Sequence, residues 1–131
     1  MNKKIGNATE KKVIEMLTKN GYWCHLFGYK AEGQPCDIIA LKNDRSILID
    51  VKHCITDRFD FVRIETNQRN CFTLATSRGN NNCGFVIYFE KSDKWKWLSM
   101  QEVYYHEIAM NRKSISCDEL GDFEDEVINK K

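Results

Sequence analysis

The chain has 131 residues, which is enough for one domain and, we expect, leaves no room for a second recognition domain. With 42% hydrophobic and 30% charged residues it has an ordinary globular composition, and no apolar run approaches the roughly 18 residues expected of a membrane span. The N-terminus carries no apolar signal-peptide core, so we expect a cytoplasmic protein whose six cysteines are reduced and mostly buried.

The net charge of +1 hides an uneven distribution. Residues 1–113 carry 18 Lys+Arg against 13 Asp+Glu, a balance of +5, whereas residues 114–131 carry 2 against 6, a balance of −4. A basic body attracts phosphate backbones, although a solvated lysine-rich surface is the commoner explanation of such a balance. We expect one domain at residues 1–110 and an acidic, mobile C-terminal tail at residues 111–131.

The hydrophobic periodicity predicts helices and strands in the order α-β-β-β-α-β-β-α. In chain order, the expected elements are a helix at 8–20, strands at 22–27, 36–42 and 46–52, a helix at 64–77, strands at 84–90 and 95–98, and a helix at 99–109. The first three strands should form an antiparallel meander. A helical crossover between the third and fourth strands makes them parallel. The expected fold class is therefore α/β, with a mixed β-sheet flanked by helices.

A carboxylate lies on the apolar stripe of the first expected helix. Val13, Ile14 and Leu17 share one face at helical spacing, and Glu10 falls on the same face. A buried acid at such a position is a candidate catalytic or metal-binding residue. The alternative is a capping box in which Asn7 is the N-cap and Glu10 its N3 partner, and the sequence favours the two interpretations equally.

Three further charged residues lie on the second and third expected strands. Alternation places Asp50 and Lys52 on one face of the third strand, roughly 7 Å apart, although a simple ion pair near a strand end would give the same pattern. Asp37 opens the otherwise apolar second strand, and a hairpin turn at 43–45 would bring it near Asp50. Two carboxylates at neighbouring strand ends repel each other unless a cation lies between them.

Such a pair of carboxylates suits Mg²⁺, which takes oxygen ligands from one or two carboxylates and leaves its other positions to water and phosphate. The metal would polarise a scissile phosphate, while a nearby lysine would orient the attacking water and offset negative charge. The catalytic set that meets this requirement is Glu10, Asp37, Asp50 and Lys52. Gln68 is a second candidate on the stripe of the second helix, where it could position water or phosphate, or simply bond to backbone.

Four segments, in this order, resemble motifs of the PD-(D/E)XK nuclease superfamily, and within it the small Holliday-junction resolvases of the archaeal Hjc-like and RecU-like types. They are Gly-Asn-Ala-Thr-Glu at 6–10, Pro-Cys-Asp-Ile-Ile-Ala-Leu at 35–41, Ile-Asp-Val-Lys at 49–52, and the stretch at 59–68. The resemblance implies a restriction-endonuclease-like core. This sequence differs from the family motif at one point: Cys36 separates Pro35 from Asp37, whereas the proline usually adjoins the aspartate.

The resemblance also implies a role for each matching residue. Asp37 and Asp50 would bind Mg²⁺, with Mn²⁺ able to substitute. The backbone carbonyl of Val51 would join them, and Glu10 would contact the metal directly or through water. Lys52 would assist the attacking water.

A metal-dependent endonuclease with DNA as its partner is the implied function, and a four-way junction is the substrate we expect. The chain has no obvious sequence-reading module, which suits a homodimer that recognises branched DNA by shape, because a two-fold protein matches a two-fold junction. The candidates for phosphate contacts are Lys3, Lys4, Lys11, Lys12, Arg58, Arg63 and Arg69.

Three other functions fit the sequence. A phage or mobile-element endonuclease would nick duplex, flap or fork DNA without preferring junctions, and only a comparison of substrates separates it from a resolvase. A non-catalytic nucleic-acid-binding module on the same fold would gain nothing from carboxylates that face phosphates. A protein-binding module would use Trp95 and Trp97, which share a strand face and which we expect instead in the core or in a dimer interface.

Overall fold

The computed structural model describes the backbone of residues 3–28 and 34–130, with side chains from residue 8 onward in these ranges. In chain order the elements are α1 (Lys3–Thr18), β1 (Trp23–Leu26), β2 (Ile38–Lys42), β3 (Arg45–Cys54), β4 (Arg58–Asp60), η1 (Phe61–Arg63), α2 (Thr66–Ser77), β5 (Cys83–Phe89), β6 (Lys94–Ser99), α3 (Met100–Tyr104), η2 (Tyr105–Ala109), β7 (Ser114–Ser116), η3 (Cys117–Glu119), β8 (Gly121–Asp122) and η4 (Glu124–Ile128). The expected elements are all found, and short ones are added after β3 and after η2.

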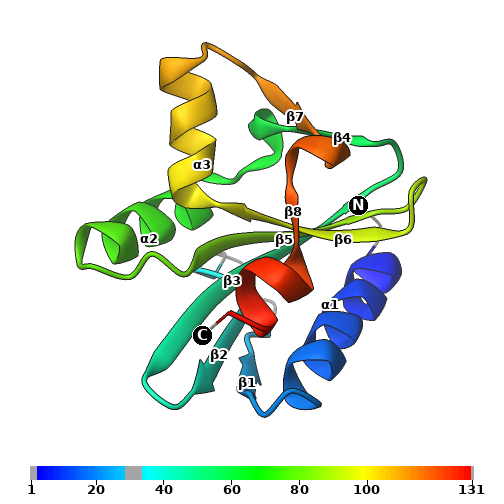
Figure 1. The fold of residues 1–131 in the computed structure, drawn as a ribbon, viewed down its shortest axis with the longest axis vertical. Helices are drawn as coiled ribbons and strands as arrows, with labels where there is room; N and C mark the ends of the chain where they lie inside the picture. The colour runs from blue at the N-terminus through cyan, green and yellow to red at the C-terminus, as the bar shows by residue number, and fades with distance from the viewer. Residues whose placement is uncertain (1–2, 29–33, 131) are drawn as a thin grey trace.

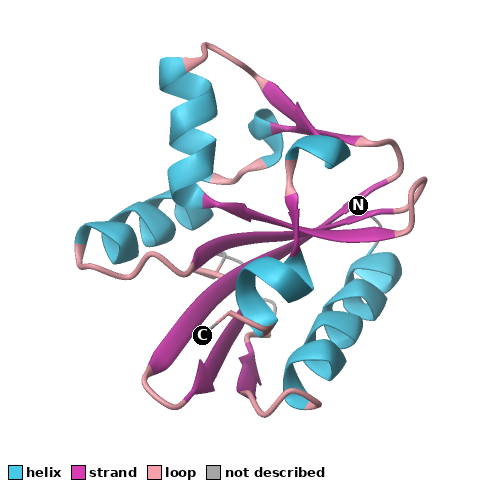
Figure 2. Ribbon diagram, in the orientation of Figure 1, coloured by secondary structure: helices cyan, strands magenta, loops and turns pink. Residues whose placement is uncertain are grey.

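Six of the described strands form one mixed sheet in the order β1-β2-β3-β5-β6-β8. β1, β2 and β3 are the expected antiparallel meander, in which Ile38 lies opposite Ile49. β3 and β5 are parallel because α2 connects them as a crossover, and the other neighbours are antiparallel. Figure 2 shows the sheet with helices on both sides. The expected α/β fold with a mixed, helix-flanked sheet is therefore confirmed.

Each face of the sheet is covered by its own apolar cluster. Val13 and Leu17 of α1 pack with Ile47 on one face. On the opposite face Phe72 of α2 packs against Phe85 of β5, with the ring centroids 5.3 Å apart. Figure 1 shows α1 on one side of the sheet and α2 with α3 on the other. Within the described residues, no helix is both long and apolar enough to cross a bilayer.

The C-terminal segment differs from the mobile acidic tail expected at residues 111–131. β7 pairs with β4, and β8 pairs with β6 at the edge of the main sheet. Phe123, Val127 and Ile128 are 0%, 3% and 4% exposed and join the cluster on the α1 face. η4 is a π-helical turn with i→i+5 hydrogen bonds, so positions four and five residues apart lie on one face, while the acids between them are exposed. The acidic side chains therefore lie on the exposed side of a C-terminal segment that packs on the sheet.

Phe123→Ala is expected to lower the free energy of unfolding by about 3–5 kcal/mol, because it empties a fully buried site. Chemical denaturation measures this change. Glu124→Ala, at an exposed neighbouring position, is the matched control and should change the free energy of unfolding by no more than about 0.5 kcal/mol. Equal, small effects of the two substitutions would show that the segment is a tail after all.

Trp95 and Trp97 share one face of β6, as strand alternation predicts, but their surroundings differ. Trp97 is 6% exposed, and its ring centroid lies 6.2 Å from that of Phe123. The interpretation of Trp97 as a core residue is confirmed. Trp95 is half-buried, and its ring packs against that of Tyr88 at a tilt of 32°, with the centroids 4.5 Å apart.

Candidate active site

The β2–β3 pairing brings Asp37 and Asp50 together. The backbone N–H of Asp37 donates to the carbonyl of Ile49 over 2.9 Å, which continues the ladder by one residue beyond β2. The backbone N–H of Val51 donates to Oδ2 of Asp37 over 2.8 Å, so the carboxylate of Asp37 turns toward the next strand. The hairpin therefore places the two acids as the turn at 43–45 predicts.

Asp50, Lys52 and Gln68 form a closed polar triangle between β3 and α2. Gln68 Nε2 donates to Asp50 Oδ1 over 2.8 Å, and Lys52 Nζ donates to Gln68 Oε1 over 3.3 Å. Lys52 Nζ also lies 3.1 Å from Asp50 Oδ2. The exposed fractions of Asp50, Lys52 and Gln68 are only 1%, 9% and 7%. Three polar side chains are thus buried together at positions where apolar residues normally pack. Such an exception to the usual burial pattern is typical of a functional site.

Two acids of this region, Asp50 and Glu10, resist ionisation. Burial raises the pKa of Asp50 well above its ordinary value, Lys52 opposes that rise, and the charge of Asp37 adds to it. Burial, and then the charge of Asp37, raise the pKa of Glu10 to about 7. A bound cation would favour the charged forms of all three carboxylates. Glu10, in the middle of α1, is therefore coupled electrostatically to Asp37.

The donor set fits one Mg²⁺ ion held by few protein ligands. Among the described residues, no cluster of three or more His, Cys, Asp and Glu side chains is placed to hold a metal. Mg²⁺ does not require one, since it is held by one or two carboxylates and keeps several waters. Asp50 Oδ2 is buried, and among the described residues it meets the Lys52 ammonium at 3.1 Å, without hydrogen-bond geometry. A buried carboxylate oxygen beside Asp37 is the kind of ligand that Mg²⁺ takes.

Gln68 contacts both Asp50 and Lys52, and its Oε1 also accepts from the N–H of Glu65 as part of the α2 capping box. Gln68→Leu removes both contacts to the acid and the lysine and is expected to lower the single-turnover rate constant of DNA cleavage by about 10- to 100-fold. Gln101→Leu, on exposed α3 surface, is the control and should leave that rate constant unchanged. If Gln68→Leu lowers only the free energy of unfolding, the glutamine is structural.

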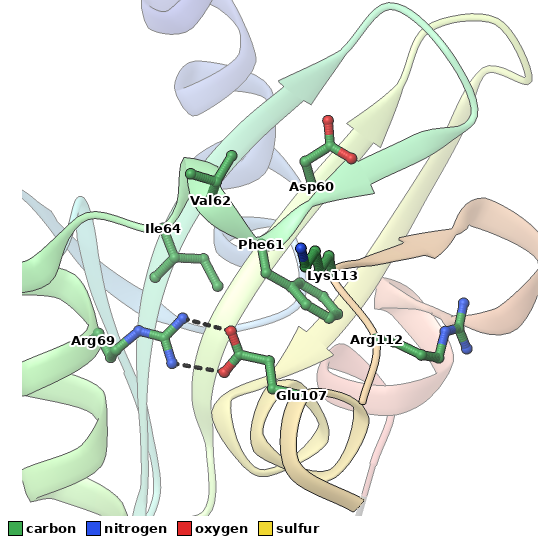
Figure 3. A pocket seen from close by; sticks show the side chains of 8 residues that line it. All are labelled: Asp60, Phe61, Val62, Ile64, Arg69, Glu107, Arg112 and Lys113. Atoms are coloured by element: carbon green, nitrogen blue, oxygen red, sulfur yellow. Dashed lines mark hydrogen bonds and ion pairs between the residues drawn. The ribbon is translucent and has the colours of Figure 1, made fainter. Parts of the chain in front are cut away.

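Two arginines expected to contact phosphate are engaged within the protein. Arg63 donates to Cys54 Sγ and to the carbonyl of His53, each over 3.1 Å. Arg69 forms a bidentate ion pair with Glu107 at 2.8 and 3.0 Å. Figure 3 shows this pair on the wall of a pocket of about 600 Å³. Both guanidinium groups therefore have partners within the protein, and their contact with phosphate stays a prediction.

The other expected phosphate contacts fall into two groups. Lys11, Lys12 and Arg58 are exposed, and Arg58 donates to Ser114 Oγ over 2.7 Å. They remain candidates for binding DNA. The side chains of Lys3 and Lys4 lie outside the described residues.

Sequence reasoning missed Gln34, which borders the site. Its Nε2 donates to Asp37 Oδ1 over 3.4 Å, and its carbonyl accepts from Asn67 Nδ2 on α2. This residue links the segment before β2 to the helix that carries Gln68. The only signal in the sequence is its position three residues before Asp37, because an irregular segment has no periodicity that marks an inward-facing side chain.

A scan against protein-family models and a search of curated proteins find no match to this sequence. Among solved structures, the chain is similar to Hjc of Archaeoglobus fulgidus, described as a Holliday junction resolvase from an archaeal hyperthermophile. The two share 18% sequence identity and superpose with a TM-score of 0.67 over 96% of this chain and 97% of that one. At this identity the likeness concerns the fold. The chain adopts the α/β fold of an Hjc-type resolvase, which confirms the restriction-endonuclease-like core that the sequence motifs imply.

Proposed function

We propose that the protein is a metal-dependent endodeoxyribonuclease that cleaves branched DNA, with the four-way junction as its substrate. The observation that carries the proposal is the convergence of Asp37, Asp50 and Lys52 at one point of a fold shared with a Holliday junction resolvase. A fold alone does not fix a function. The buried acid and lysine, which the sequence motifs single out, supply the chemistry.

The residues of the site have separable tasks. Asp37, Asp50, the carbonyl of Val51 and Glu10 would hold Mg²⁺ or Mn²⁺. When bound, the ion polarises the phosphate and lowers the pKa of water. Lys52 is held by Asp50 and Gln68 at 3.1 and 3.3 Å, so its ammonium is oriented before substrate arrives. It would position the attacking water and offset the negative charge that develops on the phosphate.

A binding module without activity explains this site less well. An acid that is 1% exposed lowers the stability of the fold in its charged form. Negative charge facing the DNA backbone would also weaken binding. A cation held by the carboxylates at the scissile phosphate would offset both the loss of stability and the repulsion of DNA.

We also propose that the active form is a homodimer, since a junction offers two equivalent strands to cut. Exposed apolar side chains are available for such a contact, among them Val62 at 89% and Ile108 at 78% exposure. Sedimentation analysis measures this state directly. A monomer at concentrations where the protein cleaves DNA would contradict the dimer and leave the nuclease proposal standing.

The test of the substrate is a comparison of labelled four-way junction, fork, flap, duplex and single-stranded DNA at equal concentration in Mg²⁺. Paired cuts restricted to the junction are expected. Equal cleavage of every DNA would support the nuclease activity and exclude a junction-specific resolvase. Binding without cleavage in either Mg²⁺ or Mn²⁺ would contradict the catalytic interpretation.

A further inference from the structure

A second cavity of about 400 Å³ lies between α1, β3 and the β5–β6 hairpin. Its floor is aromatic. Tyr88 and Trp95 lie opposite each other on β5 and β6, and their rings pack together at a tilt of 32° with centroids 4.5 Å apart. The ring of His53 on β3 meets that of Tyr88 edge-on at 5.3 Å. None of these rings belongs to the site described above, and Trp95 and Tyr88 remain half-buried at the surface.

The polar groups around this floor suit a nucleobase better than a phosphate. Glu90 and Asp93 are exposed carboxylates on the hairpin and line the cavity. Carboxylates accept hydrogen bonds from the amino groups of bases and repel phosphate. Glu90 lies 3.2 Å from His53 Nε2, and Asp93 accepts from the Tyr88 hydroxyl over 2.7 Å, so both are held beside the rings.

A cation lies on the opposite rim, where a sugar-phosphate backbone would pass. Lys12 of α1 lines the cavity and is exposed. Its Nζ is 4.0 Å from Glu15, with both side chains more than half exposed. Such a surface pair contributes little, so a phosphate can replace the carboxylate.

The cavity adjoins the catalytic residues at two points. Thr9 precedes Glu10, and His53 follows Lys52, with Thr9 Oγ1 only 3.2 Å from His53 Nδ1. Consecutive Cα atoms are about 3.8 Å apart. Lys52 and His53 point to opposite faces of β3, so a DNA strand bound at Lys52 would reach the cavity by passing around the edge of β3 beyond Ile49, where β2 no longer pairs with it.

We propose that this cavity binds an unpaired nucleobase of the DNA strand next to the cut, stacked on Trp95 with Tyr88 beside it. The proposal rests on the proposed function, and it makes the protein sensitive to unstacked bases near a branch point. Stacking on an aromatic side chain is tolerant of base identity, because every base has a π-face. The cavity would thus read an open DNA structure rather than a sequence.

The test separates bases from phosphates. Binding of a single-stranded oligonucleotide is compared with that of an abasic strand of the same length, in EDTA so that no cleavage occurs. Wild type should prefer the strand with bases by about 5- to 150-fold, the range for one stacked base. Trp95→Ala should lose that preference with unchanged affinity for the abasic strand, and Trp95→Phe should keep most of it.

Trp23→Ala is the matched control, because Trp23 is 60% exposed on β1, at the other end of α1. Thermal melts of all variants identify any loss of fold. Equal wild-type affinity for the two strands, an equal effect of Trp95→Ala and Trp23→Ala, or a change of oligomeric state in Trp95→Ala would each overturn the proposal. These outcomes leave the nuclease proposal intact, since cleavage in Mg²⁺ is measured separately.

Discussion

Asp50→Asn is expected to lower the single-turnover rate constant for DNA cleavage by about 10²-fold or more, while the fold persists. The substitution keeps the shape of the side chain and the contact with Gln68, but removes the charge that holds the metal and orients Lys52. Labelled junction DNA in Mg²⁺ measures the rate constant. Asp44→Asn, at an exposed turn position of the same hairpin, is the control and should cleave as the wild type does. Cleavage by Asp50→Asn within a few-fold of wild type would exclude Asp50 as a metal ligand.

The same variant is expected to melt at a higher temperature than wild type in EDTA at neutral pH. Burial raises the pKa of Asp50, so the folded protein favours the neutral acid. That preference stabilises the fold fully below the unfolded pKa and is lost as the pH rises through the folded pKa. Asparagine is neutral throughout, so its advantage over aspartate should grow as the pH rises above the ordinary carboxyl pKa. Catalytic residues typically lower the stability of the fold in return for activity.

Lys52→Met is expected to reduce kcat by about 10²- to 10³-fold with little change in KM, because an ammonium that acts on developing charge contributes mainly in the transition state. Steady-state cleavage of junction DNA measures both constants. Lys42→Met is the matched control, since Lys42 is a partly buried lysine on the neighbouring strand, bonded to the carbonyl of Asn20 over 2.8 Å. A rise in KM with unchanged kcat for Lys52→Met would assign Lys52 to DNA binding alone.

The local pattern of the chain predicted the arrangement of the candidate site well, because its geometry depends on short-range rules. Alternation on β3 places Asp50 and Lys52 on one face, and a tight hairpin fixes the register that brings Asp37 alongside. The helical stripe of α2 likewise turned Gln68 inward. Each inference needed only the period of one element or one turn.

The parts that sequence reasoning missed depend on contacts between distant segments. The ion pair between Arg69 and Glu107, which are 38 residues apart, was not predicted. β7 has three residues and β8 has two, which is too short for any period to show. Phe123 and Val127 are at helical spacing, but the prediction of a tail was based on the acidic residues around them and did not use this spacing.

The most direct test of the central claim, that these carboxylates and Lys52 hydrolyse phosphodiester bonds with a bound metal, is cleavage of one labelled four-way junction by wild-type protein with Mg²⁺ or with EDTA. Asp37→Asn is run in parallel. Wild-type protein is expected to give nicked products in Mg²⁺ and none in EDTA, and Asp37→Asn is expected to give none above background in Mg²⁺. Undiminished cleavage in EDTA, or by Asp37→Asn in Mg²⁺, would contradict that claim.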